Sequence, residues 1–278
     1  MNLQQYSPRG FSMLPPVVKN LLIINGLFFL AQLSIEQVFH VDLTDYLGMH
    51  YFESAKFNPA QLVSYMFLHG GFSHLFFNMF ALWMFGYTLE NAWGGKRFLT
   101  YYLVTGIGAA LVHMFVMYIS IAGIQADAAA VMRAPDPDLF AVFLTDHFPG
   151  FRSQLYEFLN AWNANPSNHE YINQASAYMD DLINLKMDVP TVGASGAVFG
   201  ILLAFGMMFP NSLIYLYFFF PIKAKWFVIL YGAAEVYFGF ANNPGDDVAH
   251  FAHLGGMIFG FFLIRYWNRK LRRYNNWE

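Results

Sequence analysis

Six apolar stretches constrain this chain more than any other feature of its sequence. A helix that crosses the hydrocarbon core of a bilayer needs roughly 20 mostly apolar residues. The segments that meet or approach this length are residues 17–39, 73–92, 98–122, 193–210, 224–240 and 248–267. Hydrophobic residues make up 57% of the chain and charged residues 12%, whereas soluble domains contain about 25% charged residues. The sequence therefore predicts an all-α polytopic membrane protein, with residues 1–278 forming one bundle of six transmembrane helices in a lipid bilayer.

A long polar segment, residues 123–190, separates the third apolar stretch from the fourth. It carries nine acidic and three basic residues, so it cannot lie in hydrocarbon. Apolar residues repeat at helical spacing within 155–162 and 172–183, and Ser167 followed by Glu170 has the spacing of a capping box for the second of these helices. We expect this segment to be a helical hairpin inserted outside the membrane between the third and fourth spans.

Basic residues predict the orientation of the bundle. With six spans both termini lie on one side, and that side receives 11 of the 15 Lys and Arg residues. The positive-inside rule assigns this side to the cytoplasm, and the opposite side then receives the insertion and a turn at residues 242–247. The N-terminus shows no cleavable signal or targeting peptide. We therefore expect a multi-pass integral protein of the bacterial inner (plasma) membrane with both termini in the cytoplasm.

The lack of cysteine in the sequence excludes several kinds of site. A chain with no Cys has no disulfide, no thiolate metal site and no cysteine nucleophile. Its net charge of −3 gives no reason to expect nucleic acid as a partner. The motifs of the chain lead us to expect neither a metal ion nor a cofactor.

A serine between glycines opens the fourth apolar stretch, in the sequence Gly193-Ala194-Ser195-Gly196. There is little side-chain bulk around this hydroxyl group, and the backbone N–H groups at the start of a helix are free to face an oxyanion. These features suit a nucleophile. The same four residues are also common at helix starts and at close helix contacts, so the rest of the chain must decide between these interpretations.

Two other apolar stretches begin with polar residues at the same predicted depth. The second stretch begins with His74 and Asn78, which share one helix face, and the sixth begins with His250 and His253. Polar residues inside spans are costly and usually functional. A histidine beside Ser195 can take its proton and return it to a leaving amine. A second imidazole, a carboxamide and the Ser195 backbone N–H can hold the developing oxyanion, so the group fits acyl transfer.

No orienting aspartate for this base is evident in the sequence. Asp246 and Asp247 lie in the solvated turn before the sixth stretch, so we interpret the site as a Ser-His dyad without a third member. Glu235 in the fifth stretch and His113 in the third are ionisable residues inside predicted spans, which makes them functional candidates. For both we favour an interhelical hydrogen bond over a catalytic role.

Taken together, these motifs resemble the rhomboid family of intramembrane serine proteases. The residues that carry the resemblance are His74 and Asn78 in His-x-x-x-Asn, Gly193, Ser195 and Gly196 in Gly-x-Ser-Gly, and Ala252, His253, Gly256 and Gly260 in Ala-His-x-x-Gly-x-x-x-Gly. The resemblance implies a six-helix rhomboid-like bundle in which Ser195 is the nucleophile and His253 the general base. It also implies that His74, Asn78 and the Ser195 backbone N–H stabilise the oxyanion.

Supporting roles follow for residues around this pair. Gly256 and Gly260 lack side chains, which lets the sixth span approach the fourth and bring imidazole to serine. Phe199 falls where the family often has a tyrosine that packs against the catalytic imidazole, and its ring keeps that role. For His250, three residues nearer the water than His253, we favour a solvated position at the membrane interface.

Two further residues have structural roles by the same resemblance. Rhomboids often carry a glutamate near the cytoplasmic end of the second span that ties the next turn to the helix, and Glu90 occupies that place. His69 lies in the loop before this span, where we expect a structural hydrogen bond.

The resemblance implies a protease whose substrates are membrane proteins with a transmembrane helix, which enter laterally between the second and fifth spans. The alternative is a catalytically silent rhomboid-like protein that binds membrane-protein clients, but silent relatives generally lack the serine or the histidine, and this chain has Ser195 and His253. A transporter predicts charges near the bilayer midplane and repeated halves, neither of which is clear here. We expect the insertion to restrict which substrates reach the site, with an inert decoration or a docking surface as alternatives.

Overall fold

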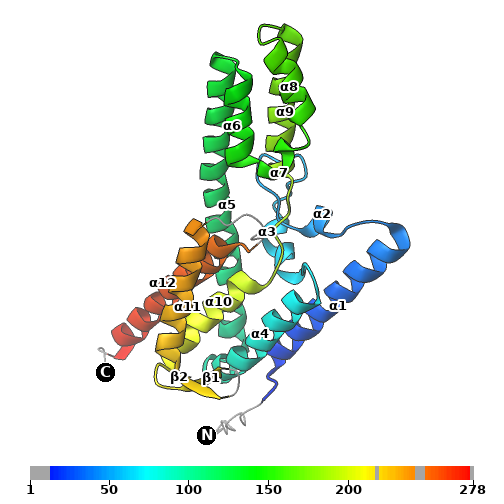
Figure 1. Ribbon diagram of the computed structural model, residues 1–278. Coiled ribbons are helices and arrows are strands. Elements are labelled where there is room, and N and C mark those ends of the chain that lie inside the picture. The colour runs from blue at the N-terminus through cyan, green and yellow to red at the C-terminus, as the bar shows by residue number, and fades with distance from the viewer. Residues whose placement is uncertain (1–12, 217–218, 242–247, 276–278) are drawn as a thin grey trace, which may run out of the picture. The chain divides into compact units, whose positions relative to one another are not determined.

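The structure, a computed structural model, describes residues 13–216, 219–241 and 248–275, with side chains to residue 269 (Figure 1). In chain order its helices are α1 (Pro16–Phe39), α2 (Thr44–Leu47), α3 (Gln61–Ser64), the 3-10 helix η1 (Tyr65–Phe67), α4 (Phe72–Trp93), α5 (Gly95–Arg133), α6 (Pro137–His147), α7 (Pro149–Arg152), α8 (Tyr156–Ala164), α9 (His169–Met187), α10 (Ser195–Met208), α11 (Ala224–Ala241) and α12 (His250–Asn275). The strands β1 (Leu213–Leu216) and β2 (Phe220–Lys223) pair antiparallel, with Leu213 opposite Lys223.

The chain divides into two compact units. Unit 1 comprises Met1–Met49, Pro59–His113 and Thr191–Glu278, and unit 2 comprises His50–Asn58 and Met114–Pro190. Helix α5 therefore contributes its first part to unit 1 and its second part to unit 2. All of the residues singled out above as candidates for catalysis belong to unit 1.

Helix α10 is the central helix of unit 1. It packs most extensively against α12 and also contacts α4 and α11, while α1 packs against α4 (Figure 1). Most of the α10 side chains are buried, and its small residues allow this close packing. A Cβ atom on Gly200 would lie 2.6 Å from Thr105 of α5, and one on Gly206 would lie 2.6 Å from Val228 of α11. Neighbouring helices thus reach the backbone of α10 where its side chains are absent.

The outward surface of unit 1 carries large apolar side chains. On α1, Ile23, Leu27 and Leu30 are 52%, 60% and 59% exposed. Among the described helices, α1 and α5 are long and apolar enough to cross a membrane by length and composition, and α10 is a shorter apolar helix. Exposed apolar surface of this extent is typical of a protein that contacts lipid.

Several helix ends differ from the sequence prediction. Helix α4 begins at Phe72 after Gly71, without a side-chain cap, one residue before the start of the second apolar stretch. Helix α5 does not end near residue 122 but runs on to Arg133, because the single glycine at position 123 is followed within a few residues by good helix formers, Gln125, Ala126 and the alanines at 128–130, and does not break the helix. Tyr215 and Phe220 belong to the paired strands β1 and β2, and the predicted turn at 242–247 lies outside the described residues.

Unit 2 has a hydrophobic core of its own. Trp162 of α8 and Phe140 of α6 are fully buried, and Tyr51 from the segment 50–58 packs into the same cluster. The predicted hairpin corresponds to α8 and α9, but α6, α7 and the second part of α5 also belong to the unit. The expected insertion is therefore a larger helical assembly than two helices.

The start of α9 corrects the cap prediction made for this helix. Helix α9 begins at His169, and the side chain of Asn168 accepts a hydrogen bond from the Glu170 backbone N–H at 2.9 Å. The capping box predicted for Ser167 is therefore wrong by one residue. Asn is as effective an N-cap as Ser, so the sequence offered two competing start signals.

Glu90 of α4 caps the start of α1. Its carboxylate accepts hydrogen bonds from the backbone N–H groups of Val17 at 2.9 Å and Val18 at 2.7 Å, and the residue is only 4% exposed. The N-cap residue of α1 is Pro15, which offers no side-chain acceptor. A carboxylate from another helix thus satisfies the first N–H groups of α1 and opposes the positive end of its dipole. Glu90 is structural, although its partner is α1 rather than the next turn.

We predict that Glu90→Gln lowers the free energy of unfolding by about 1–2 kcal/mol, because a neutral amide is a weaker acceptor for two buried N–H groups. Chemical unfolding of the purified protein in detergent measures this difference. Glu36→Gln, which changes an exposed carboxylate on α1, is the matched control and is expected to leave stability within about 0.5 kcal/mol. Equal stability of the Glu90 variant and the wild type would contradict the capping role.

Candidate active site

Ser195 is the first residue of α10 and follows a tightly held loop. Gly193 has a φ of +128°, a backbone conformation that residues with a side chain rarely adopt, and its N–H donates to the Tyr65 carbonyl at 2.9 Å. Two residues earlier, Thr191 exchanges both backbone hydrogen bonds with Met49 at 2.9 Å. The loop is thereby anchored on both sides before the chain turns into the helix and presents Ser195.

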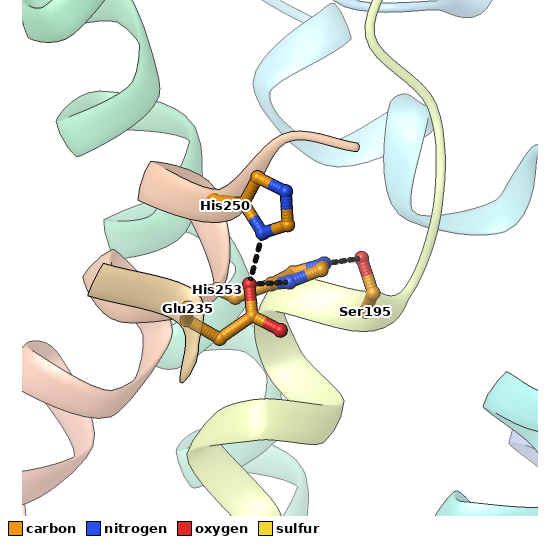
Figure 2. Close-up of polar contacts among 4 residues, drawn as sticks. All are labelled: Ser195, Glu235, His250 and His253. Atoms are coloured by element: carbon orange, nitrogen blue, oxygen red, sulfur yellow. Dashed lines mark hydrogen bonds and ion pairs between the residues drawn. The ribbon is translucent and has the colours of Figure 1, made fainter. Parts of the chain in front are cut away.

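The Ser195 hydroxyl meets an imidazole from α12. Its Oγ lies 2.8 Å from Nε2 of His253, which is 7% exposed (Figure 2). The ring of Phe199, one turn after Ser195, stacks on the His253 ring at 4.1 Å between centroids and 6° between planes. These are the distance and arrangement required of a nucleophile and its general base.

Glycines on the facing helices allow this contact. A Cβ atom on Gly256 of α12 would overlap the backbone carbonyl of Gly196, the residue after Ser195. A Cβ atom on Gly196 would overlap the side chain of Ala109, and one on Gly260 would overlap the hydroxyl group of Tyr101. The glycines therefore bring α10, α12 and α5 together at backbone distance.

His74 faces the same loop from α4. Its Nδ1 accepts a hydrogen bond from the Gly70 backbone N–H at 3.3 Å, so the neutral ring carries its hydrogen on Nε2. A Cβ atom on Gly193 would lie 2.8 Å from that Nε2. A hydrogen-bond donor is thus placed beside the loop that leads to Ser195, as an oxyanion stabiliser requires.

Asn78 lies one turn further along α4. It is 5% exposed, and its Nδ2 donates to the His74 carbonyl at 3.0 Å. This hydrogen bond holds the amide against its own helix. A role for Asn78 in oxyanion stabilisation stays a prediction.

The sequence reasoning did not foresee two residues that complete the polar group. Oε2 of Glu235, on α11, lies 2.8 Å from Nδ1 of His253 and 2.6 Å from Nδ1 of His250 (Figure 2). Glu235 makes the interhelical hydrogen bond that we expected from the sequence, and its partner is the candidate base. The interpretation as a dyad did not include this carboxylate. The predicted solvated position of His250 is wrong, because its side chain is only 11% exposed.

Two signals pointed to these residues. An isolated carboxylate in an apolar stretch is expected to have a partner, and residues at i and i+3, such as His250 and His253, share a helix face.

The same three residues have the ligand types of a zinc site. One ligand atom from each of Glu235, His250 and His253 lies within 4.8 Å of the others, and a His₂Glu set is used by catalytic zinc. Both Nδ1 atoms, however, contact the carboxylate at hydrogen-bond distance, and an N–H that donates to oxygen cannot ligate a metal at the same time. The hydrogen bonds account for the cluster.

Two other histidines lie around the site. Nε2 of His113 on α5 is 3.0 Å from Oγ1 of Thr191, so it holds the loop before Ser195. His69 makes hydrogen bonds through its backbone, with its N–H 3.1 Å from Oε1 of Gln32 and its carbonyl 3.3 Å from Nε2 of that side chain. Its ring makes no hydrogen bond within the described part of the chain, and burial lowers the pKa of His69 to about 4.

Comparison with known proteins identifies the family. The sequence model of the Rhomboid domain matches residues 56–133 and 171–270, which include every candidate catalytic residue, and the chain belongs to the rhomboid family. Family membership and the apolar helices identify it as an integral membrane protein. Residues 134–170, which contain α6 to α8, lie outside the match.

One curated relative is RHOMBOID-like protein 5 of Arabidopsis thaliana. It is 42% identical to this chain over 52 residues, which are 19% of this chain and 17% of that protein. The chain therefore matches less than a fifth of the length of this relative.

We predict that Gly256→Ala separates Ser195 from His253, because the new methyl group pushes α12 away from the Gly196 carbonyl. The rate at which a fluorophosphonate probe labels Ser195 is expected to fall on the order of 10²-fold, the lower range of a general-base contribution. Gly26→Ala is the matched control, since a Cβ atom there meets nothing within 4 Å on helix α1. Equal labelling of the folded Gly256 variant and the wild type would show that this approach does not set the catalytic distance.

Proposed function

We propose that this protein is an intramembrane serine endopeptidase that cleaves transmembrane segments of other membrane proteins. The observation that carries the proposal is the 2.8 Å contact between Ser195 Oγ and His253 Nε2, made among apolar helices of a rhomboid protein. His74, the Ser195 backbone N–H and Asn78 are the proposed oxyanion stabilisers. Gly193, Gly196, Gly256, Gly260 and Phe199 support this geometry.

The reaction follows from these positions. Ser195 Oγ attacks the carbonyl carbon of a peptide bond while His253 Nε2 takes the hydroxyl proton. The oxyanion that forms is held by N–H donors, among them Nε2–H of His74. Collapse of this intermediate breaks the C–N bond, and the leaving amine takes the proton from His253. Water then attacks the acyl-enzyme with His253 again as base, which releases the new carboxylate and restores Ser195.

The site is expected to lie below the membrane surface. We interpret α1, α4, the first part of α5, α10, α11 and α12 as six spans. Helix α10 has 14 residues, roughly 21 Å of helix, whereas the hydrocarbon core is about 30 Å thick. Ser195 at its start is therefore recessed, among the surrounding helices rather than in contact with water at the surface.

The proposed topology supports a proposal for the membrane side of the site and for the class of substrate. The distribution of basic residues supports cytoplasmic termini in a bacterial inner membrane, with the catalytic loop toward the opposite side. A transmembrane substrate must unwind locally before a peptide bond reaches Ser195, because helical hydrogen bonds shield its carbonyl groups. Helices α4 and α11 carry exposed aromatic side chains, including Phe76, Phe77 and Tyr237, and substrates are proposed to enter between these helices.

Labelling of the purified protein with a fluorophosphonate probe tests the proposal. We expect the wild type to react and Ser195→Ala to be unreactive, while His253→Ala reacts on the order of 10²–10⁴-fold more slowly, since the serine loses its general base. Cleavage of a co-reconstituted transmembrane substrate is expected to depend on the same two residues. A folded wild type that neither labels nor cleaves would favour the catalytically silent, client-binding alternative.

We also propose that the region from 123 to 190 restricts which substrates are cleaved. The support is that it has its own hydrophobic core, contains residues outside the family match, and rejoins the chain a few residues before Ser195. We place it outside the membrane because of its acidic composition.

Replacing residues 126–185 with a short linker tests this role. We expect the variant to cleave a wider panel of transmembrane substrates, because a restriction on access is removed. The rate of Ser195 labelling by a small fluorophosphonate is the internal control and is expected to stay within about threefold of the wild type. Unchanged preference across the panel would mean that the region does not select substrates.

A further inference from the structure

We propose that Glu235 and His250 are positioning residues for the base, so that the catalytic group is an array of serine, histidine, glutamate and a second histidine. In this array the Glu235 carboxylate holds His253 in the form that accepts the Ser195 proton, and His250 holds the carboxylate. The inference rests on the proposed protease function and adds two residues to it. It is supported by side-chain contacts among three helices of unit 1.

The four side chains are arranged as such an array requires. His253 lies between its two partners, with Nε2 facing Ser195 at 2.8 Å and Nδ1 facing Glu235 at 2.8 Å (Figure 2). His250 reaches the same carboxylate oxygen, Oε2, at 2.6 Å. Glu235 comes from α11, both histidines from α12 and Ser195 from α10. The nucleophile, the carboxylate and the two imidazoles thus come from three different helices.

The contacts with Glu235 select one tautomer of His253. One oxygen atom can accept two hydrogen bonds but can donate at most one, and an ionised carboxylate only accepts. Two imidazoles that contact the same oxygen through Nδ1 are satisfied together when each donates an Nδ1–H. His253 then carries its hydrogen on Nδ1, and the lone pair of Nε2 points at the Ser195 hydroxyl. This is the only neutral tautomer in which His253 can remove the serine proton.

Glu235 also offsets the charge that His253 gains. When His253 takes the serine proton it becomes a cation, and its side chain is only 9% exposed. A buried cation without a partner is costly, and a carboxylate in direct contact offsets that cost. Glu235, whose side chain is 6% exposed, is the acidic residue that touches this ring in the described part of the chain. Glu235 therefore orients the His253 ring before proton transfer and stabilises the positive charge on that ring afterwards.

His250 restrains the carboxylate of Glu235. A buried carboxylate that accepts one hydrogen bond is free to rotate about its terminal torsion, whereas two donors on one oxygen restrain it. The ring of His250 also packs on Phe238, one turn after Glu235, with centroids 5.8 Å apart. The ring of His253 is held by stacking on Phe199. The base is thus fixed by stacking on its face and by hydrogen bonds at both nitrogens.

Glu235→Gln tests the array in the full-length protein reconstituted with a transmembrane substrate. We expect kcat to fall on the order of 10⁴-fold, as when an orienting carboxylate is neutralised in serine proteases, with KM within about threefold of the wild type. Glu235→Asp keeps the charge and is expected to restore kcat at least about tenfold above the Gln variant. His250→Ala leaves the carboxylate with one donor, and we expect kcat about tenfold lower than in the wild type.

Glu90→Gln is the matched control, because Glu90 is an equally buried carboxylate that caps α1 instead of touching the site. We expect this variant to lose stability but to keep kcat per folded molecule within about twofold. A kcat for Glu235→Gln within threefold of the wild type would overturn the proposal, as would a Glu235→Asp variant no better than the Gln variant.

A spectroscopic measurement separates this inference from the proposed function. Nitrogen NMR of protein labelled with ¹⁵N-histidine distinguishes the two neutral tautomers, and His253→Gln assigns the signal. We expect His253 to carry its hydrogen on Nδ1 in the wild type and to lose this preference in Glu235→Leu. If the wild type neither labels nor cleaves, the protease proposal fails, and the tautomer alone decides this inference: hydrogen on Nδ1 supports it, and hydrogen on Nε2 overturns it.

Discussion

The approach of α12 to α10 at their glycines is the constraint on which the rest of unit 1 depends. Gly256 lies against the carbonyl of Gly196, so the two helices touch through backbone rather than side chains. In lipid, where burial of apolar surface does not drive helices together, such close packing is a main source of association. Gly196 follows Ser195 directly and Gly256 comes one turn after His253, so the same contact sets the distance between hydroxyl and imidazole. The packing of α10 against α12 and the proposed chemistry of Ser195 therefore depend on the same contact.

The second constraint is that each buried polar group needs a partner. Glu90 and Glu235 are both almost fully buried carboxylates, and an unpaired buried charge is costly. The protein satisfies them in different ways. Glu90 receives two backbone N–H groups at the start of α1, so its hydrogen bonds contribute to stability. Glu235 receives two imidazoles, and because one of them is the candidate base, its hydrogen bonds bear on reactivity.

The parts of the site that could be predicted are those carried by local motifs. Ser195 was identified from the glycines around it, and His253 from the glycines that follow it on the same helix. Glu235 and His250 were interpreted separately, as an interhelical hydrogen-bonding residue and a solvated interfacial residue. No spacing in the sequence links α11 to one face of α12. The ends of α4, α5 and α9 were misjudged for a related reason. At these ends, neighbouring residues compete as caps, or a glycine interrupts the helix only weakly. The alternative ends differ by only one or a few residues and by little free energy.

By itself, the sequence determined that this is a helical membrane protein of the rhomboid type, because apolar length and a set of short motifs depend on residue order alone. It also predicted that serine, histidine and amide groups lie near the ends of three helices. Only the tertiary structure decided which polar atoms meet, including the shared oxygen of Glu235, and that the insertion belongs to a unit with its own core. The physical reason is that a hydrogen bond requires two atoms within about 3 Å, and helix packing sets that distance between residues far apart in the chain.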